Sequence, residues 1–199
     1  MANQGVNTGR RRFLTASTAV VGGVGAVFAA VPFIQSWKPS ARAQVAGAPV
    51  TVDISRLLPG QRLTATWRGQ PVWLIRRTEE QLALLPTLDE NLRDPASENP
   101  EMQPAYAQNP HRSLRPELLV LVGICTHLGC VPLFRPELVP QPFDSEWKGG
   151  FFCPCHSSRF DLAGRVFQGV PAPTNLKVPP YHFLDDNRVV LGVDPDGVA

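Results

Sequence analysis

The longest apolar stretch of the chain lies close to its N-terminus. Residues 13–37 contain no charged side chain, and residues 14–34 are mostly Ala, Val, Gly, Leu and Phe. A helix over residues 14–34 is about 31 Å long at about 1.5 Å per residue, which is enough to span the hydrocarbon core of a bilayer. The pattern predicts a transmembrane anchor helix over residues 14–37.

After residue 50 the apolar positions fall into short runs bounded by turn residues, a pattern typical of β-strands. The run at 118–124 is apolar apart from Gly123, so we expect a buried strand that leads directly into Cys125. Residues 79–85 fit a short helix with Thr78 as its cap. The expected fold class is therefore mainly β, with antiparallel sheets and Pro-rich loops. The expected strands cover residues 50–54, 63–67, 71–77, 118–124 and 188–193.

Two other segments lack a regular apolar pattern. Residues 38–49 are poor in large side chains and carry prolines near both ends, so we expect a hinge linker between the anchor and the rest of the chain. Residues 89–114 contain four prolines and many polar side chains, which predicts a long surface loop with little regular structure. Residues 50–199 are long enough to form one domain around a single core.

Charge is distributed unevenly, although the formal net charge is only +2. All five basic residues before Asp53 stand without an acidic residue, which leaves a net charge of −3 on the remainder. A mildly acidic domain is a poor partner for nucleic acid. The basic residues that precede the apolar stretch place residues 1–13 in the cytoplasm by the positive-inside rule, and everything after Trp37 outside.

The segment Arg10-Arg11-Arg12-Phe13-Leu14 resembles a twin-arginine export signal, although Gly9 stands where the signal usually has Ser or Thr. Export by this route suits a protein that folds around a cofactor before it crosses the membrane. Residues 41–43 read Ala-Arg-Ala, so a cleaved signal peptide is the alternative. A signal core typically has about 7–15 apolar residues, and the longer stretch found here favours a retained anchor.

Two short segments contain every cysteine of the chain and two of its four histidines. Each supplies one Cys–His pair and one further cysteine. Three chemistries use such a set: a structural zinc site, two disulfides, or a two-iron, two-sulfur cluster with cysteines on one iron and histidines on the other. Zinc leaves two cysteines without a role, and two disulfides leave the histidines unexplained. The segments are Cys125-Thr126-His127-Leu128-Gly129-Cys130 and Cys153-Pro154-Cys155-His156-Ser157-Ser158.

Both segments resemble those of the Rieske iron-sulfur proteins, whose pattern is Cys-x-His-Leu-Gly-Cys followed by Cys-x-Cys-His-x-Ser. The resemblance implies an antiparallel β Rieske head over residues 50–199, with a small cluster-binding subdomain at about 118–180. It implies one [2Fe-2S] cluster per chain and a disulfide between the two cluster loops. The implied metal ligands are Cys125, His127, Cys153 and His156, and the implied disulfide joins Cys130 to Cys155.

Two thiolates leave an oxidised cluster of two ferric ions and two sulfides neutral, whereas four thiolates give a dianion. A neutral centre accepts an electron more easily, and Rieske centres lie at roughly −150 to +300 mV against about −400 mV for plant-type ferredoxins. A quinol can therefore reduce such a centre. The resemblance makes His156 the residue that hydrogen-bonds the quinol, since imidazole has an ionisable N–H that links electron uptake to proton uptake.

Residues beside the ligands refine this interpretation. The resemblance implies that the Ser158 hydroxyl donates a hydrogen bond to a cluster sulfide and raises the reduction potential. Ser157 stands where glycine is common, and Phe160 stands where many ubiquinol-oxidising members have a tyrosine bonded to a ligand sulfur. We therefore expect a lower potential than in tyrosine-bearing relatives. Residues 169–173 resemble the proline loop that covers the cluster from a third side, and we expect Leu128 to shield the cluster and touch the docking surface.

The resemblance runs from Arg10 to about Pro180. Together with the anchor, it implies the membrane-bound, proton-translocating electron-transfer subunit of a bacterial quinol–cytochrome c oxidoreductase, with its head in the periplasm. The implied partners are a cytochrome b subunit, a c-type cytochrome subunit and a quinol, within a homodimeric multisubunit complex. The alternative is a Rieske subunit of another exported oxidoreductase, such as arsenite oxidase. A soluble dioxygenase ferredoxin usually lacks the disulfide pair and the export segment. His111 and His182 lie in no motif, and we expect neither to be a ligand.

Overall fold

The computed structural model describes residues 5, 7–41, 43 and 47–194. The chain forms two compact units, residues 1–45 and 46–199, and each is described by itself. In the first, helix α1 runs over Thr8–Ser36, and the Asn7 side chain caps it by accepting a hydrogen bond of 3.1 Å from the backbone N–H of Arg10. The helix begins six residues before the predicted span, so its first turns contain the arginine cluster.

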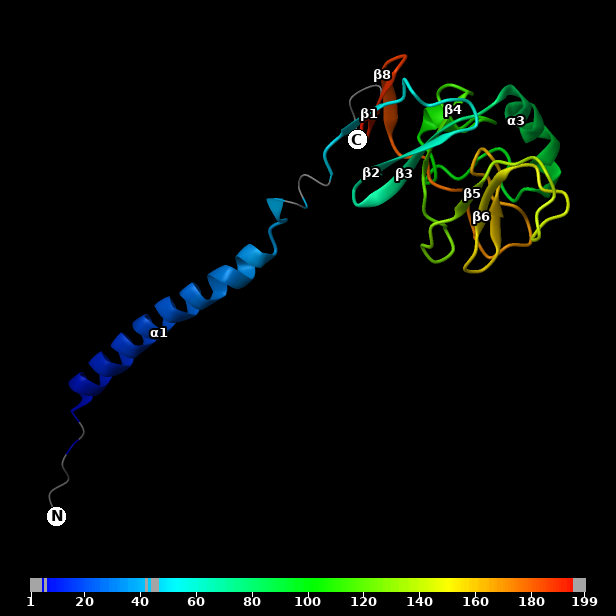
Figure 1. Ribbon diagram of the computed structural model, residues 1–199. Helices are drawn as coiled ribbons and strands as arrows, with labels where there is room; N and C mark the ends of the chain where they lie inside the picture. The colour runs from blue at the N-terminus through cyan, green and yellow to red at the C-terminus, as the bar shows by residue number, and fades with distance from the viewer. Residues whose placement is uncertain (1–4, 6, 42, 44–46, 195–199) are drawn as a thin grey trace. The chain divides into compact units, whose positions relative to one another are not determined.

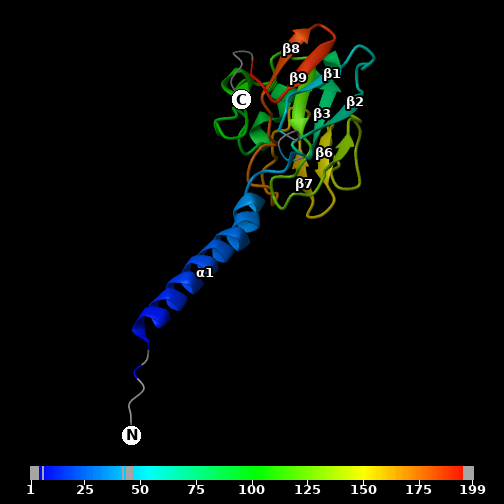
Figure 2. The same cartoon turned by 90° about the vertical axis from the view of Figure 1, so that its left-hand side faces the viewer.

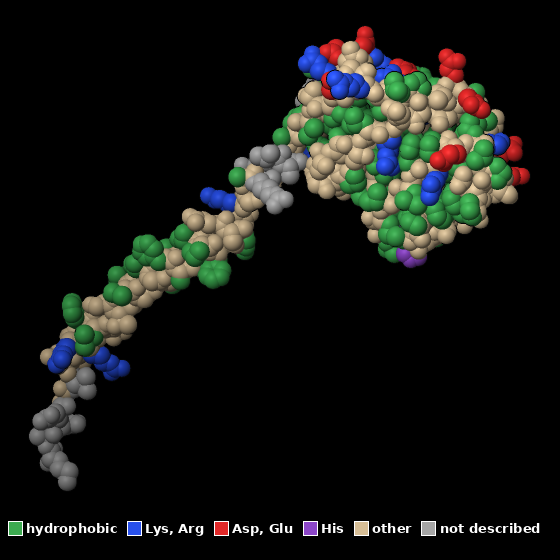
Figure 3. All heavy atoms as spheres, in the orientation of Figure 1, with side chains coloured by type: hydrophobic (Ala, Val, Ile, Leu, Met, Phe, Trp, Pro, Cys, Tyr) green, Lys and Arg blue, Asp and Glu red, His purple; other side chains and the backbone are tan. Residues whose placement is uncertain are grey.

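Helix α1 is long and apolar enough to cross a membrane, judged by length and composition, with a mean hydropathy of 1.9. None of its side chains is buried within the structure. Figure 3 shows hydrophobic and uncharged side chains along the helix, whose basic residues lie in its first turns, with none in its last turn. The helix therefore has the surface of a segment surrounded by lipid rather than by water.

The second unit is built from three antiparallel sheets, each with three strands, which confirms the mainly β fold (Figure 1). The first sheet has the order β1-β9-β8, the second β2-β3-β4 and the third β5-β6-β7. The strands are β1 (Val50–Asp53), β2 (Arg62–Trp67), β3 (Gln70–Arg76), β4 (Leu118–Val122), β5 (Leu133–Arg135), β6 (Gly150–Cys153), β7 (Ser158–Phe160), β8 (Tyr181–Asp185) and β9 (Arg188–Leu191).

The strands expected from the apolar pattern, β1, β2, β3, β4 and β9, are all present, with ends that differ by no more than two residues. Every residue of β4 is buried, as its apolar sequence predicts. Helix α3 occupies Glu79–Leu84, and Thr78 and Gln81 cap it reciprocally, since each side chain accepts a hydrogen bond from the other's backbone N–H. Two 3₁₀-helices follow, Leu85–Asn91 and Ala105–Ala107.

The expectation of a surface loop over residues 89–114 is confirmed only in part, because the segment has little regular structure and many exposed residues but several of its side chains are buried. Apart from two 3₁₀ segments the backbone is irregular, but Leu92, Ala107 and Arg112 are at most 2% exposed. Gln103 is also buried, and its side-chain amide donates to two carbonyl groups of this same segment. The polar side chains that suggested a solvated loop instead satisfy backbone groups in the interior of the head.

Aromatic rings join the second and third sheets, and Figure 2 shows these sheets beside each other. The ring of Trp73 in β3 stacks on that of Phe151 in β6, with centroids 5.1 Å apart, and Phe134 of β5 packs on the same ring at 5.6 Å. A Cβ atom at Gly123 would lie 2.3 Å from Cε2 of Trp73, so only glycine fits there. This packing fixes the backbone two residues before Cys125.

Candidate metal centre

The first cysteine segment forms a tight loop directly after β4. The backbone N–H of Cys125 donates to the carbonyl of Cys130 at 2.7 Å, and the N–H of Gly129 donates to the carbonyl of Cys125 at 3.0 Å. Gly129 adopts φ +82°, a left-handed conformation that favours glycine. These bonds close the loop on itself, with the Cys125 side chain 2% exposed beneath it.

The second segment is the turn of the β6–β7 hairpin. Cys153, the last residue of β6, pairs with Ser158, the first residue of β7, so residues 154–157 form the loop between them. Cys153 and Ser158 are buried, whereas Cys155 and His156 in the loop are exposed. Ser157 has φ +59°, in the region where a residue with a side chain is strained, at the position where glycine is common in the Rieske pattern.

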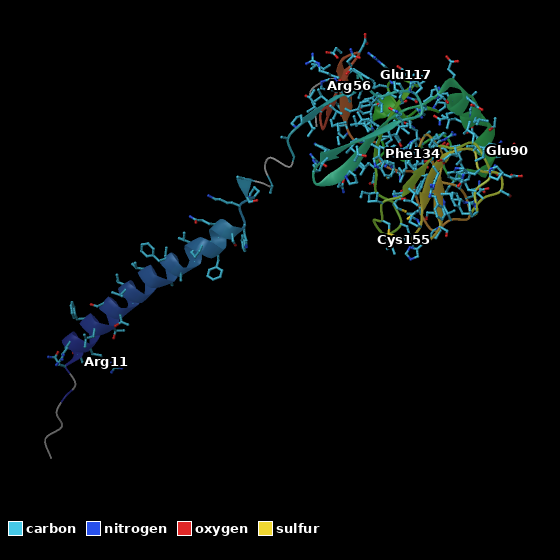
Figure 4. All side chains as sticks on the ribbon, in the orientation of Figure 1. Arg11, Arg56, Glu90, Glu117, Phe134 and Cys155 are labelled. Carbon is cyan, nitrogen blue, oxygen red and sulfur yellow. A yellow bond between two sulfur atoms is a disulfide. The ribbon has the colours of Figure 1, made fainter. Side chains whose placement is uncertain are left out.

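A disulfide joins the two loops. It links Cys130 to Cys155 with their Cα atoms 6.8 Å apart, as the resemblance implies. The sulfur of Cys153 lies within 4.8 Å of both disulfide sulfurs, and Cys125 and Cys153 are the two free cysteines of the chain. Figure 4 places Cys155 and its sulfur at one edge of the head. The pairing leaves one buried thiol on each loop.

The free thiols of Cys125 and Cys153 lie next to each other, and hydrogen-bond donors face the sulfur of Cys125. Burial raises the pKa of Cys125, and hydrogen bonds from the backbone N–H of His127 and from the Ser158 hydroxyl lower it in part. These donors stabilise negative charge on sulfur. A thiol that is protonated when alone becomes a thiolate once a metal cation binds it.

The two histidines of the motif meet across the two loops. The ring centroids of His127 and His156 lie 4.7 Å apart, and the ring planes are at 87° to each other. His127 is half-buried and His156 is exposed, a difference that the sequence does not reveal. Leu128 beside them is 70% exposed, and Figure 3 shows histidine next to hydrophobic side chains at the lower edge of the head.

A third segment, residues 169–173, which resemble the proline loop, together with the adjoining Thr174, is hydrogen-bonded to residues of both cysteine segments. The backbone N–H of Ala172 donates to the Ser158 hydroxyl at 3.1 Å. The Thr126 hydroxyl donates to the carbonyl of Thr174 at 2.8 Å, so this segment is bonded to both cysteine loops. Val170 and Ala172 are buried. No motif marks Thr126, and its partner is 48 residues away in the sequence.

The donor set fits a Rieske cluster. Two thiols and two imidazoles converge from two loops, and the other two cysteines are already used in the disulfide. The ligands available are thus two soft thiolates and two imidazoles, the set that such a cluster requires. The remaining histidines lie in no cysteine segment: the His182 ring lies 3.0 Å from the carbonyl of Val193, and the backbone carbonyl of His111 accepts a hydrogen bond from Arg77.

Comparisons with known proteins agree with this geometry. Residues 49–180 match the family described as Rieske [2Fe-2S] domain, and residues 1–40 match the one described as ubiquitinol-cytochrome C reductase Fe-S subunit TAT signal. The chain is 58% identical to the ubiquinol-cytochrome c reductase iron-sulfur subunit of Allochromatium vinosum over 98% of this chain and 93% of that protein. It is 42% identical to the corresponding subunit of Rhodospirillum rubrum over 94% of each chain.

Among solved structures, a chain of a hyperthermophilic respiratory Complex III is 26% identical and matches 89% of this chain and 98% of its own length, with a TM-score of 0.48. A score below 0.5 does not establish a shared arrangement of the whole chain. Family membership therefore depends on the sequence matches.

The chain belongs to the Rieske iron-sulfur protein family. Its relatives within that family include the bacterial ubiquinol-cytochrome c reductase iron-sulfur subunits, and its cofactor is a Rieske-type [2Fe-2S] cluster. The twin-arginine export signal expected from Arg10, Arg11 and Arg12 is supported by the match at residues 1–40. The relatives do not favour the arsenite oxidase alternative.

Proposed function

We propose that this chain carries electrons from a quinol to a c-type cytochrome as the Rieske subunit of a bacterial quinol–cytochrome c oxidoreductase. The observation that carries the proposal is the pairing of an exposed imidazole with buried thiols: His156 reaches the surface beside Cys125 and Cys153, which are each 2% exposed. Such a site can meet a substrate through the imidazole while water is kept from the sulfurs.

In this proposal Cys125 and Cys153 would hold one iron of the cluster, and His127 and His156 would hold the other. When bound, the cluster supplies reversible acceptance of one electron. The protein holds the two loops together through the disulfide, and it donates hydrogen bonds toward the sulfur of Cys125 from the Ser158 hydroxyl and from the backbone N–H of His127. Donors of this kind stabilise the more negative state.

His156 is the residue that we propose contacts the quinol. Its ring stands on the exposed turn of a hairpin, so its outer nitrogen is within reach of a substrate hydroxyl and can take the proton that the quinol loses. The side chains of Leu128 and Val131 are 70% and 52% exposed. They offer an apolar surface that fits a quinone ring and the entrance of a membrane-embedded site.

The anchor and signal support the proposed location. Export through the twin-arginine route places the head outside the cytoplasm, and helix α1 then holds it to the membrane. In this arrangement the head lies in the periplasm, next to a cytochrome b subunit in the membrane and a c-type cytochrome subunit. We propose a homodimeric multisubunit complex. Of the hinge linker at 38–49, residues 42 and 44–46 lie outside the described residues.

Purification from membranes tests this function. We expect cytochromes b and c to co-purify with the chain and the preparation to reduce cytochrome c when quinol is added. Leu128→Asn should lower that activity several-fold, because a polar amide would be placed in the apolar contact surface. Leu58→Asn is the matched control, since Leu58 is also exposed, at 59%, but lies between β1 and β2. Co-purification of a molybdenum subunit in place of the cytochromes would overturn the proposal.

A further inference from the structure

Three arginines are buried in the head with no role in the metal centre described above. Arg77, Arg112 and Arg165 are 3%, 0% and 1% exposed, respectively. Charged side chains are almost never buried so deeply unless they are paired. Their positions therefore call for a structural or functional reason.

All three guanidinium groups converge on one turn, residues 161–165, which we call the clamped turn. Arg77 donates to the carbonyl of Leu162 at 3.0 Å. Arg112 donates to the carbonyls of Ala163 and Gly164 at 3.2 and 3.4 Å. Arg165, the last residue of the turn, forms an ion pair of 2.8 Å with the carboxylate of Asp161, the first residue.

The clamped turn is directly connected to the walls of the metal centre. It follows β7, and the first residue of β7, Ser158, forms a hydrogen bond with Cys125. The carbonyl of Gly164 also accepts a hydrogen bond of 2.8 Å from the backbone N–H of Leu176, just beyond the proline loop. The arginines are therefore connected to the second cysteine loop through β7 and to the end of the proline loop through the hydrogen bond between Gly164 and Leu176.

Positive charge exceeds negative charge in this buried cluster. Among the described residues, Asp161 is the one buried carboxylate. Arg165 has a second partner in Asp89, whose side chain is 49% exposed, but Arg77 and Arg112 form no ion pair with any described residue. The half-buried Asp94 and the exposed Glu117 attract Arg112 and Arg77 electrostatically without such a contact. Burial lowers the pKa of Arg77 and of Arg112 to about 10, so both remain protonated at neutral pH.

We propose that this arginine cluster raises the reduction potential of the [2Fe-2S] cluster through its unbalanced buried charge. Reduction adds one negative charge to the site, and positive charge inside the protein stabilises that state because the interior screens it less than water does. The arginines act as positioning and tuning residues, since they touch neither the ligands nor the substrate. The proposal rests on the cofactor alone, so it holds whichever quinol or electron acceptor the protein uses.

An EPR-monitored redox titration of membranes that contain the full complex tests this role. Arg112→Gln should shift the one-electron reduction equilibrium about threefold toward the oxidised cluster, which is about 28 mV at about 59 mV per tenfold change. Arg112→Lys keeps the charge and should leave the potential near that of the wild type. Asp161→Asn removes the buried negative charge and should shift the equilibrium about threefold in the opposite direction.

Arg115→Gln is the matched control. Arg115 lies three residues from Arg112, but its side chain is 39% exposed and pairs with the exposed Asp186, so solvent screens its charge. This variant should leave the potential unchanged.

A purely structural role predicts a different pattern. If Arg112→Lys shifts the potential as far as Arg112→Gln, or if Asp161→Asn leaves it unchanged or lowers it, the proposal is wrong. Loss of the [2Fe-2S] cluster from all three variants, Arg112→Gln, Arg112→Lys and Asp161→Asn, would also overturn the proposal. The buried charges would then serve only to hold the fold. Because the potential is measured without quinol turnover, failure of this inference is distinguishable from failure of the proposed function.

Discussion

The ring centroids of His127 and His156 lie 4.7 Å apart, although one residue stands in the loop after β4 and the other in the β6–β7 turn. The disulfide between Cys130 and Cys155 holds those two loops together. Two imidazoles are thus brought to one edge of the head, with the free thiols of Cys125 and Cys153 buried behind them.

Removal of the Ser158 hydroxyl should lower the midpoint potential. This hydroxyl accepts a hydrogen bond from the backbone N–H of Ala172 and donates one to the sulfur of Cys125. One hydrogen bond is worth about 1 kcal/mol, which corresponds to about 40 mV for one electron. We expect Ser158→Ala to lower the potential by about this amount in a redox titration. Ser157→Ala, which removes an exposed hydroxyl from the same turn, should leave it unchanged.

Phe160→Tyr should raise the midpoint potential by a similar amount, about 40 mV for one added hydrogen bond to sulfur. Phe160 is fully buried in β7, two residues after Ser158, at the position where many relatives have tyrosine. Phe152→Tyr on the neighbouring strand is the control, because Phe152 stacks on Phe143 rather than on the metal centre. No rise in the Phe160→Tyr variant would refute the role assigned to this position.

Ser157→Gly should stabilise the second cysteine loop. Ser157 adopts φ +59°, where a residue with a Cβ atom is strained by about 1–2 kcal/mol, and glycine removes that strain but loses more entropy on folding. We expect the free energy of unfolding to rise by about 0.5–1 kcal/mol, measured by denaturant titration. A decrease in stability would show that the serine hydroxyl makes a contact that outweighs the strain.

Cys130→Ser should weaken the clamp between the two loops. The disulfide spans 25 residues, and a loop of this length contributes about 3.5 kcal/mol of stability in the chain-entropy account. We expect easier unfolding in denaturant and faster bleaching of the visible absorbance of the cluster. Mild reduction of the wild-type disulfide should reproduce the effect. Equal cluster lifetimes in the variant and the wild type would show that the disulfide does not stabilise the site.

Several elements follow from the sequence because local signals decide them. The apolar residues of β4 predict a buried strand, and the Thr78–Gln81 capping pair marks the start of α3. The residues of the metal centre can also be predicted from the sequence, because the motif places every ligand type at a fixed spacing. Strands β5, β6, β7 and β8 were not predicted. β5 and β7 have only three residues, a run too short to carry periodicity, and neither β6 nor β8 shows a strict alternation of apolar and polar residues.

The interior of the segment at 89–114 was not predictable for a different reason. Arg112 and Gln103 are polar residues of the kind that is typical of a solvated loop. Their hydrogen-bond partners, however, are backbone carbonyls, some of them supplied by residues distant in sequence. For Arg112 these partners lie 51 and 52 residues away in the clamped turn. Only the folded chain shows that these charges are buried.

Rapid-freeze EPR of the purified complex tests the central claim most directly. The oxidised complex is mixed with ubiquinol, and the signal of the reduced [2Fe-2S] cluster is followed together with the absorbance of the c-type cytochrome. We predict that both become reduced within the time of one enzymatic turnover. If the cluster stays oxidised in the presence of quinol and is reduced instead by a donor such as arsenite, this account of the protein is contradicted.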